Sequence, residues 1–426
     1  MLKLLRQRNF GCVWIAGLIS TIGDFVLFIA LPFYIYDLTG SALLTGGMFV
    51  AQTLPSLLWS SLAGVFVDRW DRRRTMIVAD LTRAAVLLLL LLVHSREWIG
   101  LVYVAAFLES SMSQFFNPAK SALVPELVDE QQLLAANSLT AISDALPQVL
   151  GLALGGVLFA ALGFHSIIWV DTISYLLSAT LLFMVAVAPH MTAEIHSSPV
   201  TAAALVAVWQ DWRAGVRLVR ADRLVTMLFV IFGIASLSQG LLNVLLVPFV
   251  KSVLHGGSVE LGQIVTAQGV GGLIGSFLLG RLGKTIKPTV LMGVCGIISG
   301  LILLAIYHTA TLGPLLNLPP VLLATGLIGI GGMPFIGLFI TIQTMLQASV
   351  ADQFRGRVFG TLGMAVSLML LLGLGLGSVL GDRIGIVQTL NISAMLYCSI
   401  GLLPLLVHMQ PAALPPPQPL ELEEQL

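Results

Sequence analysis

The sequence predicts an all-α integral membrane protein with twelve transmembrane helices in two pseudo-symmetric six-helix bundles. The 426-residue chain is 57% hydrophobic and only 10% charged, whereas a soluble domain carries roughly a quarter of its residues as charges. Long apolar runs recur along the chain, and a helix of about 20 apolar residues spans a bilayer with every backbone group hydrogen-bonded. The second half of the chain also echoes the first, which indicates a duplicated unit.

The apolar runs are separated by turns rich in glycine and proline. The first run begins within the stretch MLKLLRQRNFGCVWIAGLIS and continues to Tyr36, which is longer than the roughly 7–15 residues of a signal-peptide core. We therefore expect it to remain as a membrane helix. The predicted spans are residues 11–36, 45–67, 74–93, 98–118, 138–162, 166–188, 224–250, 258–280, 288–308, 319–346, 356–380 and 385–408.

The distribution of basic residues predicts the orientation of these spans, because Lys and Arg accumulate in cytoplasmic loops. The N-terminal segment and every second connection hold 17 of the 21 Lys and Arg, with Lys120 counted in the connection after the fourth span. The alternate connections hold only Arg96, Lys251 and Arg383. We expect both termini and the central loop in the cytoplasm, and the protein in the plasma (inner) membrane.

The longest polar break, near the middle of the chain, divides it into domains. It predicts an N-terminal six-helix bundle over 1–189, a cytoplasmic central loop over 190–223 and a C-terminal bundle over 224–409. The tail over 410–426 is proline-rich and acidic, which favours disorder. The formal net charge of zero argues against a nucleic-acid partner. The sequence shows no P-loop, metal-ligand cluster or nucleophile–base pattern, so we expect neither an enzyme nor a bound cofactor or metal.

The turn after the second span carries six charges between Asp68 and Arg74, in the stretch GVFVDRWDRRRT. It aligns with SFLLGRLGKTIK (276–287) in the second half of the chain, where Gly280 replaces Asp68, and a second pair of segments repeats at a similar separation. The turn resembles the signature of the major facilitator superfamily between spans two and three. The residues in matching positions are Gly64, Asp68, Arg69, Arg72 and Arg73.

Two further stretches, FFNPAKSALVPELV (115–128) and TMLQASVADQFRGRVFG (344–360), look like the branch of that superfamily that holds the enterobactin exporter and the macrolide-efflux proteins. The resemblance implies two bundles that rock around a central cavity, and it implies export.

Asp68 is predicted to act as half of a cytoplasmic gate. A helix N-terminus carries roughly half a positive charge, so Asp68 could dock at the start of span eleven, near 355–360, with Arg72 and Arg73 compensating its charge. This latch would close the cytoplasmic side. The alternative interpretation is a solvated loop whose arginines only anchor the topology.

Ionisable residues inside the spans need an explanation, because each costs roughly 2.5–3.5 kcal/mol at the bilayer centre. The candidates near the bilayer centre all belong to the first six spans, whereas spans seven to twelve offer only neutral polar groups there, such as Gln239, Asn243, Gln268 and Gln343. The candidates are Asp24, Asp80, Arg83, Glu109, Asp144 and Asp171.

Asp24 and Glu109 lie midway along spans one and four, which line the cavity in the resembled fold. We interpret them as proton-coupling or substrate-binding groups, with a structural interhelical hydrogen bond as the alternative. Asp80 and Arg83, three residues apart on one helix face, predict an ion pair that braces the gate. Asp171 is expected to have a structural partner, and the role of Asp144 stays open.

Span five contains PQVLGLALGGVLF, in which Gly151, Gly155 and Gly156 resemble the antiporter signature of drug exporters. The alternative is close helix packing, which small residues permit. Aromatic residues of the spans could cradle an apolar ligand or simply pack. They are Phe25, Phe28, Trp59, Phe115, Phe335 and Phe339.

We therefore expect a monomeric secondary transporter that exports a small amphipathic drug-like or secondary-metabolite molecule by alternating access, in exchange for protons. One alternative is a dedicated exporter of a single metabolite such as a siderophore or a lipid. Another is a facilitator-like protein that senses or scaffolds without transporting.

Overall fold

The structure, a computed structural model, describes residues 2–67, 69–186, 213, 215–282 and 286–406. Helices make up nearly all of this part of the chain. The first half contains α1 (Leu2–Leu5), α2 (Arg8–Thr39), α3 (Ala42–Val67), α4 (Arg72–Leu88), α5 (Ile99–Leu123) and α6 (Leu133–Phe183). The second half contains α8 (Arg223–Pro248), α9 (Ser258–Leu282), α10 (Pro288–Tyr307), α11 (Thr309–Leu315), α12 (Pro320–Ser349), α13 (Asp352–Ile384) and α14 (Ile386–Leu406).

Eleven of the described helices are long and apolar enough to cross a membrane. One of them, α6, has 51 residues, which at 1.5 Å per residue is about 77 Å, more than twice the roughly 30 Å of a bilayer core. Gly163 interrupts it with a left-handed φ of 73°, at the break predicted between residues 162 and 166. The predicted all-α membrane fold is confirmed, with α6 holding two of the predicted spans.

Short polar motifs set where several helices begin and end. Asp71 caps α4, because its carboxylate accepts a hydrogen bond of 2.8 Å from the backbone N–H of Arg74. Asp222 caps α8 in the same way. Gly40 ends α2 with a φ of 62°, and its N–H donates to the carbonyl of Tyr36, the left-handed C-cap that glycine favours.

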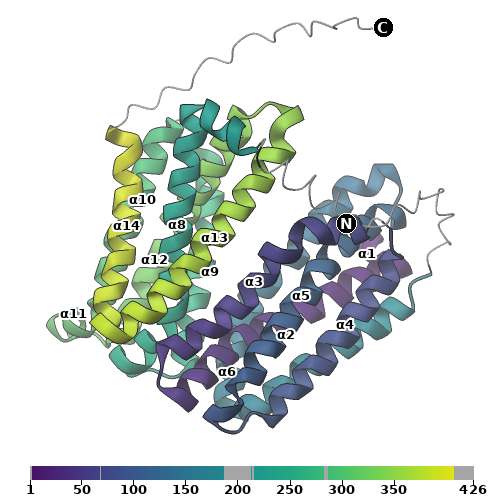
Figure 1. Cartoon of the computed structure of the whole chain (residues 1–426), viewed down its shortest axis with the longest axis horizontal. Coiled ribbons are helices and arrows are strands. Elements are labelled where there is room, and N and C mark those ends of the chain that lie inside the picture. The colour runs from purple at the N-terminus through teal and green to yellow at the C-terminus, as the bar shows by residue number, and fades with distance from the viewer. Residues whose placement is uncertain (1, 68, 187–212, 214, 283–285, 407–426) are drawn as a thin grey trace, which may run out of the picture.

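The helices form two bundles that meet at one end of the molecule. In the first bundle α2 packs against α6, and α5 packs against α3 and α4. In the second bundle α8 packs against α13, α9 against α12, and α10 against α12 and α14. The main contacts between the bundles are those of α3 with α13 and of α6 with α9. Figure 1 shows the bundles diverging toward the end that carries the N-terminus and the last residues of α14.

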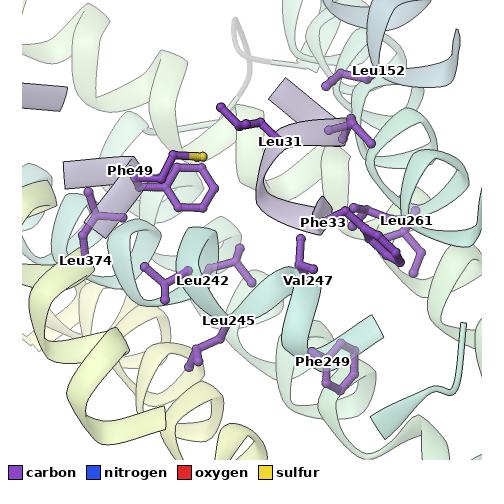
Figure 2. Close-up of a cluster of buried hydrophobic side chains, with 14 of the residues drawn as sticks. Leu31, Phe33, Phe49, Leu152, Leu242, Leu245, Val247, Phe249, Leu261 and Leu374 are labelled. Carbon is purple, nitrogen blue, oxygen red and sulfur yellow. The ribbon is translucent and has the colours of Figure 1, made fainter. Parts of the chain in front are cut away.

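The opposite end, which we call the joined end, is held by polar contacts between the bundles. Lys251, after α8, forms a salt bridge with Asp37 at the end of α2. The hydroxyls of the neighbouring Tyr36 and Ser252 are 3.0 Å apart, and Ser41 donates a 3.4 Å hydrogen bond to Asp382. Apolar residues of both bundles form one continuous core behind these contacts (Figure 2). A second core cluster contains residues of the first bundle alone, as expected where the bundles have separated.

Two helices of different bundles cross with backbone contact at Gly156 of α6. The hydroxyl of Ser258 in α9 donates a 3.1 Å hydrogen bond to the Gly156 carbonyl. A Cβ added at Gly156 would lie 3.1 Å from the Cα of Gly262 and would clash with the Ser258 carbonyl. No side chain therefore separates α6 from α9 at this point.

Two features differ from the expectation for the connections. Lys120 is not a loop residue, because α5 continues to Leu123 and buries it; its ammonium lies 2.9 Å from the Asp144 carboxylate. In the described part of the predicted central loop, residues 215–221 are helical. Gly215 there lies against Thr361 of α13, so this segment packs on the second bundle.

Candidate functional site

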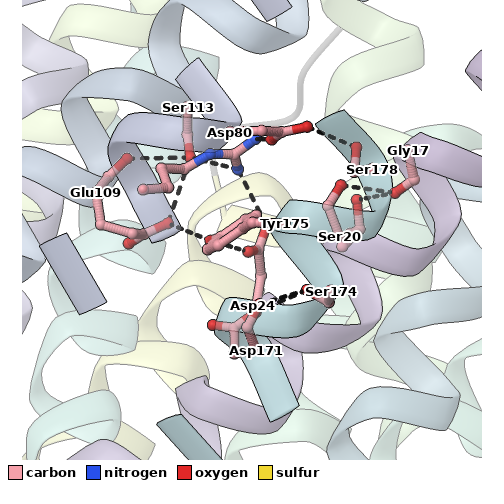
Figure 3. A network of polar contacts seen from close by, with 12 residues as sticks. Gly17, Ser20, Asp24, Asp80, Glu109, Ser113, Asp171, Ser174, Tyr175 and Ser178 are labelled. Atoms are coloured by element: carbon pink, nitrogen blue, oxygen red, sulfur yellow. Dashed lines mark hydrogen bonds and ion pairs between the residues drawn. The ribbon is translucent and has the colours of Figure 1, made fainter. Parts of the chain in front are cut away.

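A polar cluster lies inside the first bundle, where α2, α4, α5 and the second part of α6 meet (Figure 3). Each of these helices contributes at least one member. The members are Asp24, Asp80, Arg83, Glu109, Ser113, Asp171, Ser174, Tyr175 and Ser178. We call this set the carboxylate cluster.

Arg83 of α4 is the centre of the cluster and is only 2% exposed. Its guanidinium forms a salt bridge with Asp80 one turn earlier, and its Nη1 lies 3.7 Å from Asp24. The guanidinium also lies over the rings of Phe116 and Tyr175, with its Cζ 4.6 and 4.4 Å from their centroids. Ion pairs and aromatic faces together replace the water that a buried guanidinium would lose.

Tyr175 of α6 connects the two carboxylates that were predicted to couple protons. Its hydroxyl donates to Asp24 and lies 3.3 Å from the Glu109 carboxylate. A phenol has one proton to donate, so it serves one carboxylate fully at a time. The hydrogen bond of Tyr175 therefore depends on which of the two carboxyl groups holds a proton of its own.

Asp80 and Asp171 lie deeper than Asp24 and Glu109. The Asp80 carboxylate is fully buried and accepts a 2.5 Å hydrogen bond from Ser178. Asp171 is also fully buried; Ser174 donates to its Oδ1 at 3.1 Å, and its Oδ2 has no partner. Among the described residues no basic group lies within salt-bridge distance of Asp171. A carboxyl group so placed avoids the cost of an uncompensated charge by being neutral.

Asp171 fits into the cluster because Gly23 of α2 has no side chain. A Cβ at Gly23 would collide with the Asp171 carboxylate and would lie 2.5 Å from the Ser174 hydroxyl. Gly23 precedes Asp24 directly, so a glycine on α2 brings the polar face of α6 against the helix that carries the exposed acid.

The cluster holds four carboxyl groups and one guanidinium, which gives it a variable charge. One carboxylate balances Arg83, and only protons can neutralise the others within the described part of the cluster. The Asp24 side chain is 30% exposed and Glu109 is half-buried, so protons and ligands can reach these two. The arrangement combines accessible acids, a shared hydroxyl and a permanent counter-ion.

The structure brings together four of the predicted site residues, whereas Arg72 and Arg73 of the predicted gate bind elsewhere in the first bundle. Asp24, Glu109, Asp80 and Arg83 share one cluster, so the Asp80–Arg83 pair lies beside the two acids.

Two basic residues of the predicted gate, Arg72 and Arg73, bind within the first bundle. Arg72 pairs with Glu126 and donates 2.9 Å to the Ala122 carbonyl, and Arg73 donates to the last carbonyls of α6. Gly64 lies in α3 and Arg69 in the turn that follows. Asp68 lies outside the described residues.

The three glycines of span five make close helix contacts. A Cβ at Gly151 would lie 2.5 Å from Cβ of Phe25, and one at Gly155 would lie 3.0 Å from the carbonyl of Val26, both on α2. Gly156 faces the other bundle, as described above. All three positions therefore let α6 approach a neighbouring backbone.

Tyr175 and the serines of α6 were missed from the sequence, although a signal was present. Asp171, Ser174, Tyr175 and Ser178 follow the spacing i, i+3, i+4, i+7, which places them on one face of a helix. A polar stripe of this kind within an apolar span indicates a face directed into the bundle. The stripe therefore indicates that one face of the sixth span lies against the other helices of the first bundle.

Comparisons with known proteins agree with this architecture. A family model described as Major Facilitator Superfamily matches residues 13–374 and also 228–424. The uncharacterized MFS-type transporter YfiS of Bacillus subtilis (strain 168) is 26% identical over 412 residues, covering 94% of this chain and 93% of its own. Macrolide efflux protein A of Streptococcus pyogenes is 24% identical over 406 residues, with 93% and 95% covered. The structure of a bacterial homologue of the iron transporter ferroportin in an inward-facing state is similar with a TM-score of 0.74 and 17% identity, covering 93% and 98%.

Proposed function

The chain belongs to the Major Facilitator Superfamily and is a multi-pass membrane transporter, not an enzyme; on this premise we propose that it exports amphipathic drug-like or secondary-metabolite molecules in exchange for protons. The observation that carries the proposal is the hydroxyl of Tyr175 between the carboxylates of Asp24 and Glu109. Efflux is supported by the similarity to macrolide efflux protein A.

In this proposal the carboxylate cluster alternates between two charge states. With Asp24 and Glu109 ionised, their negative charge exceeds what Arg83 can balance and attracts a cationic or dipolar substrate. With protons bound, the attraction ends and the substrate leaves on the other side. Arg83 is held by Asp80 throughout, so it stays as a fixed counter-ion while the accessible acids change charge.

The basic residues of alternate connections support a cytoplasmic position for both termini. With that orientation the diverging end in Figure 1 faces the cytoplasm and the joined end faces outward. The structure is then the state that loads substrate from inside the cell. We further propose that the gate residues Gly64, Asp68, Arg69, Arg72 and Arg73 act in the opposite state, when the bundles close on the cytoplasmic side.

A cationic or neutral substrate agrees with the site better than an anionic one. Arg83 is the basic residue of the carboxylate cluster, and its guanidinium already contacts Asp80 and approaches Asp24. An anionic siderophore would meet excess negative charge here. This comparison favours drug-like amphiphiles over a siderophore.

Proton movement in proteoliposomes tests the proposal. The purified protein is placed in vesicles that enclose a pH-sensitive dye, and a pH gradient is imposed across their membrane. The dye then reports the internal pH while cationic, neutral and anionic amphiphiles are added in turn. The variants are Asp24→Asn and Glu109→Gln, and the matched control is Glu97→Gln, which removes an exposed carboxylate from a connection. We expect substrate-triggered proton flux in the wild type and the control, and its loss in either cluster variant.

Two other outcomes would change the proposal. Substrate equilibration without proton flux would make the protein a uniporter, and the cluster would then serve binding alone. Unchanged flux in both cluster variants would place proton coupling elsewhere in the chain.

A further inference from the structure

The carboxylate cluster has a counterpart at the equivalent position of the second bundle. Tyr175 in the last span of the first half corresponds to Tyr397 in α14, the last span of the second half. Asp24 in the middle of α2 corresponds to Gln239 in the middle of α8. The separation along the chain within each of these pairs is close to the separation between the repeated segments. At equivalent positions of the duplicated fold, the first half therefore has an acidic side chain and the second half a neutral amide.

This location in the second bundle is a cavity of about 290 Å³ between α8, α12, α13 and α14. Its walls include two aromatic pairs. Phe232 and Phe339 meet edge to face with ring centroids 5.6 Å apart, and Phe335 and Tyr397 are 5.2 Å apart. Phe339 is 49% exposed, so the cavity is open. Two of the helices in its wall, α8 and α13, also contact the first bundle.

The cavity has no acidic or basic side chain among its eleven lining residues. The serine and the glutamine in its wall donate hydrogen bonds to residues of their own helix, α8. The Ser236 hydroxyl donates 2.8 Å to the Phe232 carbonyl, and the Gln239 amide donates 2.8 Å to Asn243. A charged group entering the cavity would lose its water without gaining a partner of opposite charge. An uncharged ring would gain the edge and face contacts that aromatic side chains provide.

We propose that this cavity binds an uncharged aromatic ring system of the transported molecule. The proposal rests on the proposed function and assigns the two ends of an amphipathic substrate to different bundles. The ring system enters the cavity of the second bundle, and the charged end faces Asp24 and Glu109 in the first. A volume of 290 Å³ equals that of about ten water molecules, which suits a fused two- or three-ring system.

Binding of the neutral fluorophore N-phenyl-1-naphthylamine to the whole protein in lipid nanodiscs tests this assignment, with empty nanodiscs subtracted. Ala235→Phe fills the cavity from α8, and Val230→Phe adds a ring to the same helix at a side chain that is 49% exposed. We expect saturable binding in the wild type, at least ten-fold weaker binding in Ala235→Phe and unchanged binding in Val230→Phe. Unsaturable binding, or equal affinities in the two variants, would overturn the proposal.

Further measurements distinguish an aromatic ligand from a lipid acyl chain and test where the charged end of a ligand lies. Gln239→Leu keeps the cavity apolar and should bind the probe at least as tightly; a loss there would overturn the proposal even if Ala235→Phe failed to fold. Naphthalene should displace the probe at concentrations where dodecane does not, whereas equal displacement would assign the cavity to a lipid acyl chain. A quaternary ammonium derivative of the probe would place its ring in the cavity and its charge toward Asp24 and Glu109, so Ala235→Phe should weaken its binding as well; equal affinity in the wild type and Ala235→Phe would overturn the assignment of the two ends.

These measurements need no proton gradient, so they can fail independently of the proposed antiport. Ring binding that responds to Ala235→Phe, without proton flux under any condition, would leave the cavity assigned and the antiport refuted. Proton flux that depends on Asp24, with probe binding indifferent to Ala235→Phe, would refute the cavity alone.

Discussion

The salt bridge between Asp37 and Lys251 joins the two bundles, and removing it should shift the protein toward the state in which the opposite end closes. Asp37 ends α2 of the first bundle, and Lys251 follows α8 of the second. In an alternating-access cycle these residues must separate when the joined end opens. Asp37→Asn and Lys251→Met therefore both destabilise the present state relative to the other one.

The two substitutions should shift the conformational equilibrium by different amounts. The side chains of Lys251 and Asp37 are 38% and 37% exposed, so solvent screens the pair and its loss costs about 0.5–1 kcal/mol. Lys251 also lies 5.6 and 5.9 Å from the ring centroids of Phe33 and Tyr36, and these contacts add about 0.5 kcal/mol each. The equilibrium should shift about 2–5-fold in Asp37→Asn and about 10–30-fold in Lys251→Met, since 1.4 kcal/mol is a factor of ten.

Distances between spin labels at the diverging end measure this shift directly. Labels at Leu134, near the start of α6, and at Lys287, before α10, lie in different bundles, with the three native cysteines replaced. The short-distance population should rise in both variants, more in Lys251→Met, and stay constant in the control Glu97→Gln. An unchanged distribution, or a larger effect from Asp37→Asn, would refute the reasoning.

Three further predictions concern the cluster and the crossing of α6 and α9. Tyr175→Phe removes the shared hydrogen bond, worth about 1–3 kcal/mol in a buried site, and should lower the ratio of protons to substrate in flux assays while ring stacking on Arg83 persists. Asp171→Asn keeps the Ser174 contact and should unfold thermally like the wild type, whereas Asp171→Leu should lose about 1–3 kcal/mol of stability. Gly156→Ala forces a Cβ between α6 and α9, costs about 1–3 kcal/mol in this state, and should raise the same short-distance population as Lys251→Met.

Much of the fold follows from the sequence because bilayer thickness sets the length of each span. The predicted break between residues 162 and 166 coincides with the left-handed Gly163. The end of the fourth span was placed too early, at residue 118, since Lys120 reads as a loop charge. Its partner Asp144 comes from the next helix, and a pairing between helices is not visible in local composition.

The candidate site was predictable residue by residue but not as one unit. Asp24, Glu109, Asp80 and Arg83 each stand out as ionisable groups in apolar spans. Their convergence depends on which helix face turns inward, and that is decided by contacts such as Gly23 against Asp171. Tyr175 carries no formal charge and therefore resembled any other aromatic residue of a span.

The confinement of the carboxylate cluster to the first bundle has a consequence for how the protein is made. Every member of the cluster precedes Phe183, so Arg83 can meet its carboxylates before the second half has left the ribosome. At about 5–20 residues per second, the remaining residues take roughly 10–50 s to synthesise. During that interval the buried guanidinium of the first bundle can already form its ion pair with Asp80, and the apolar second bundle joins a partner in which this ion pair is in place.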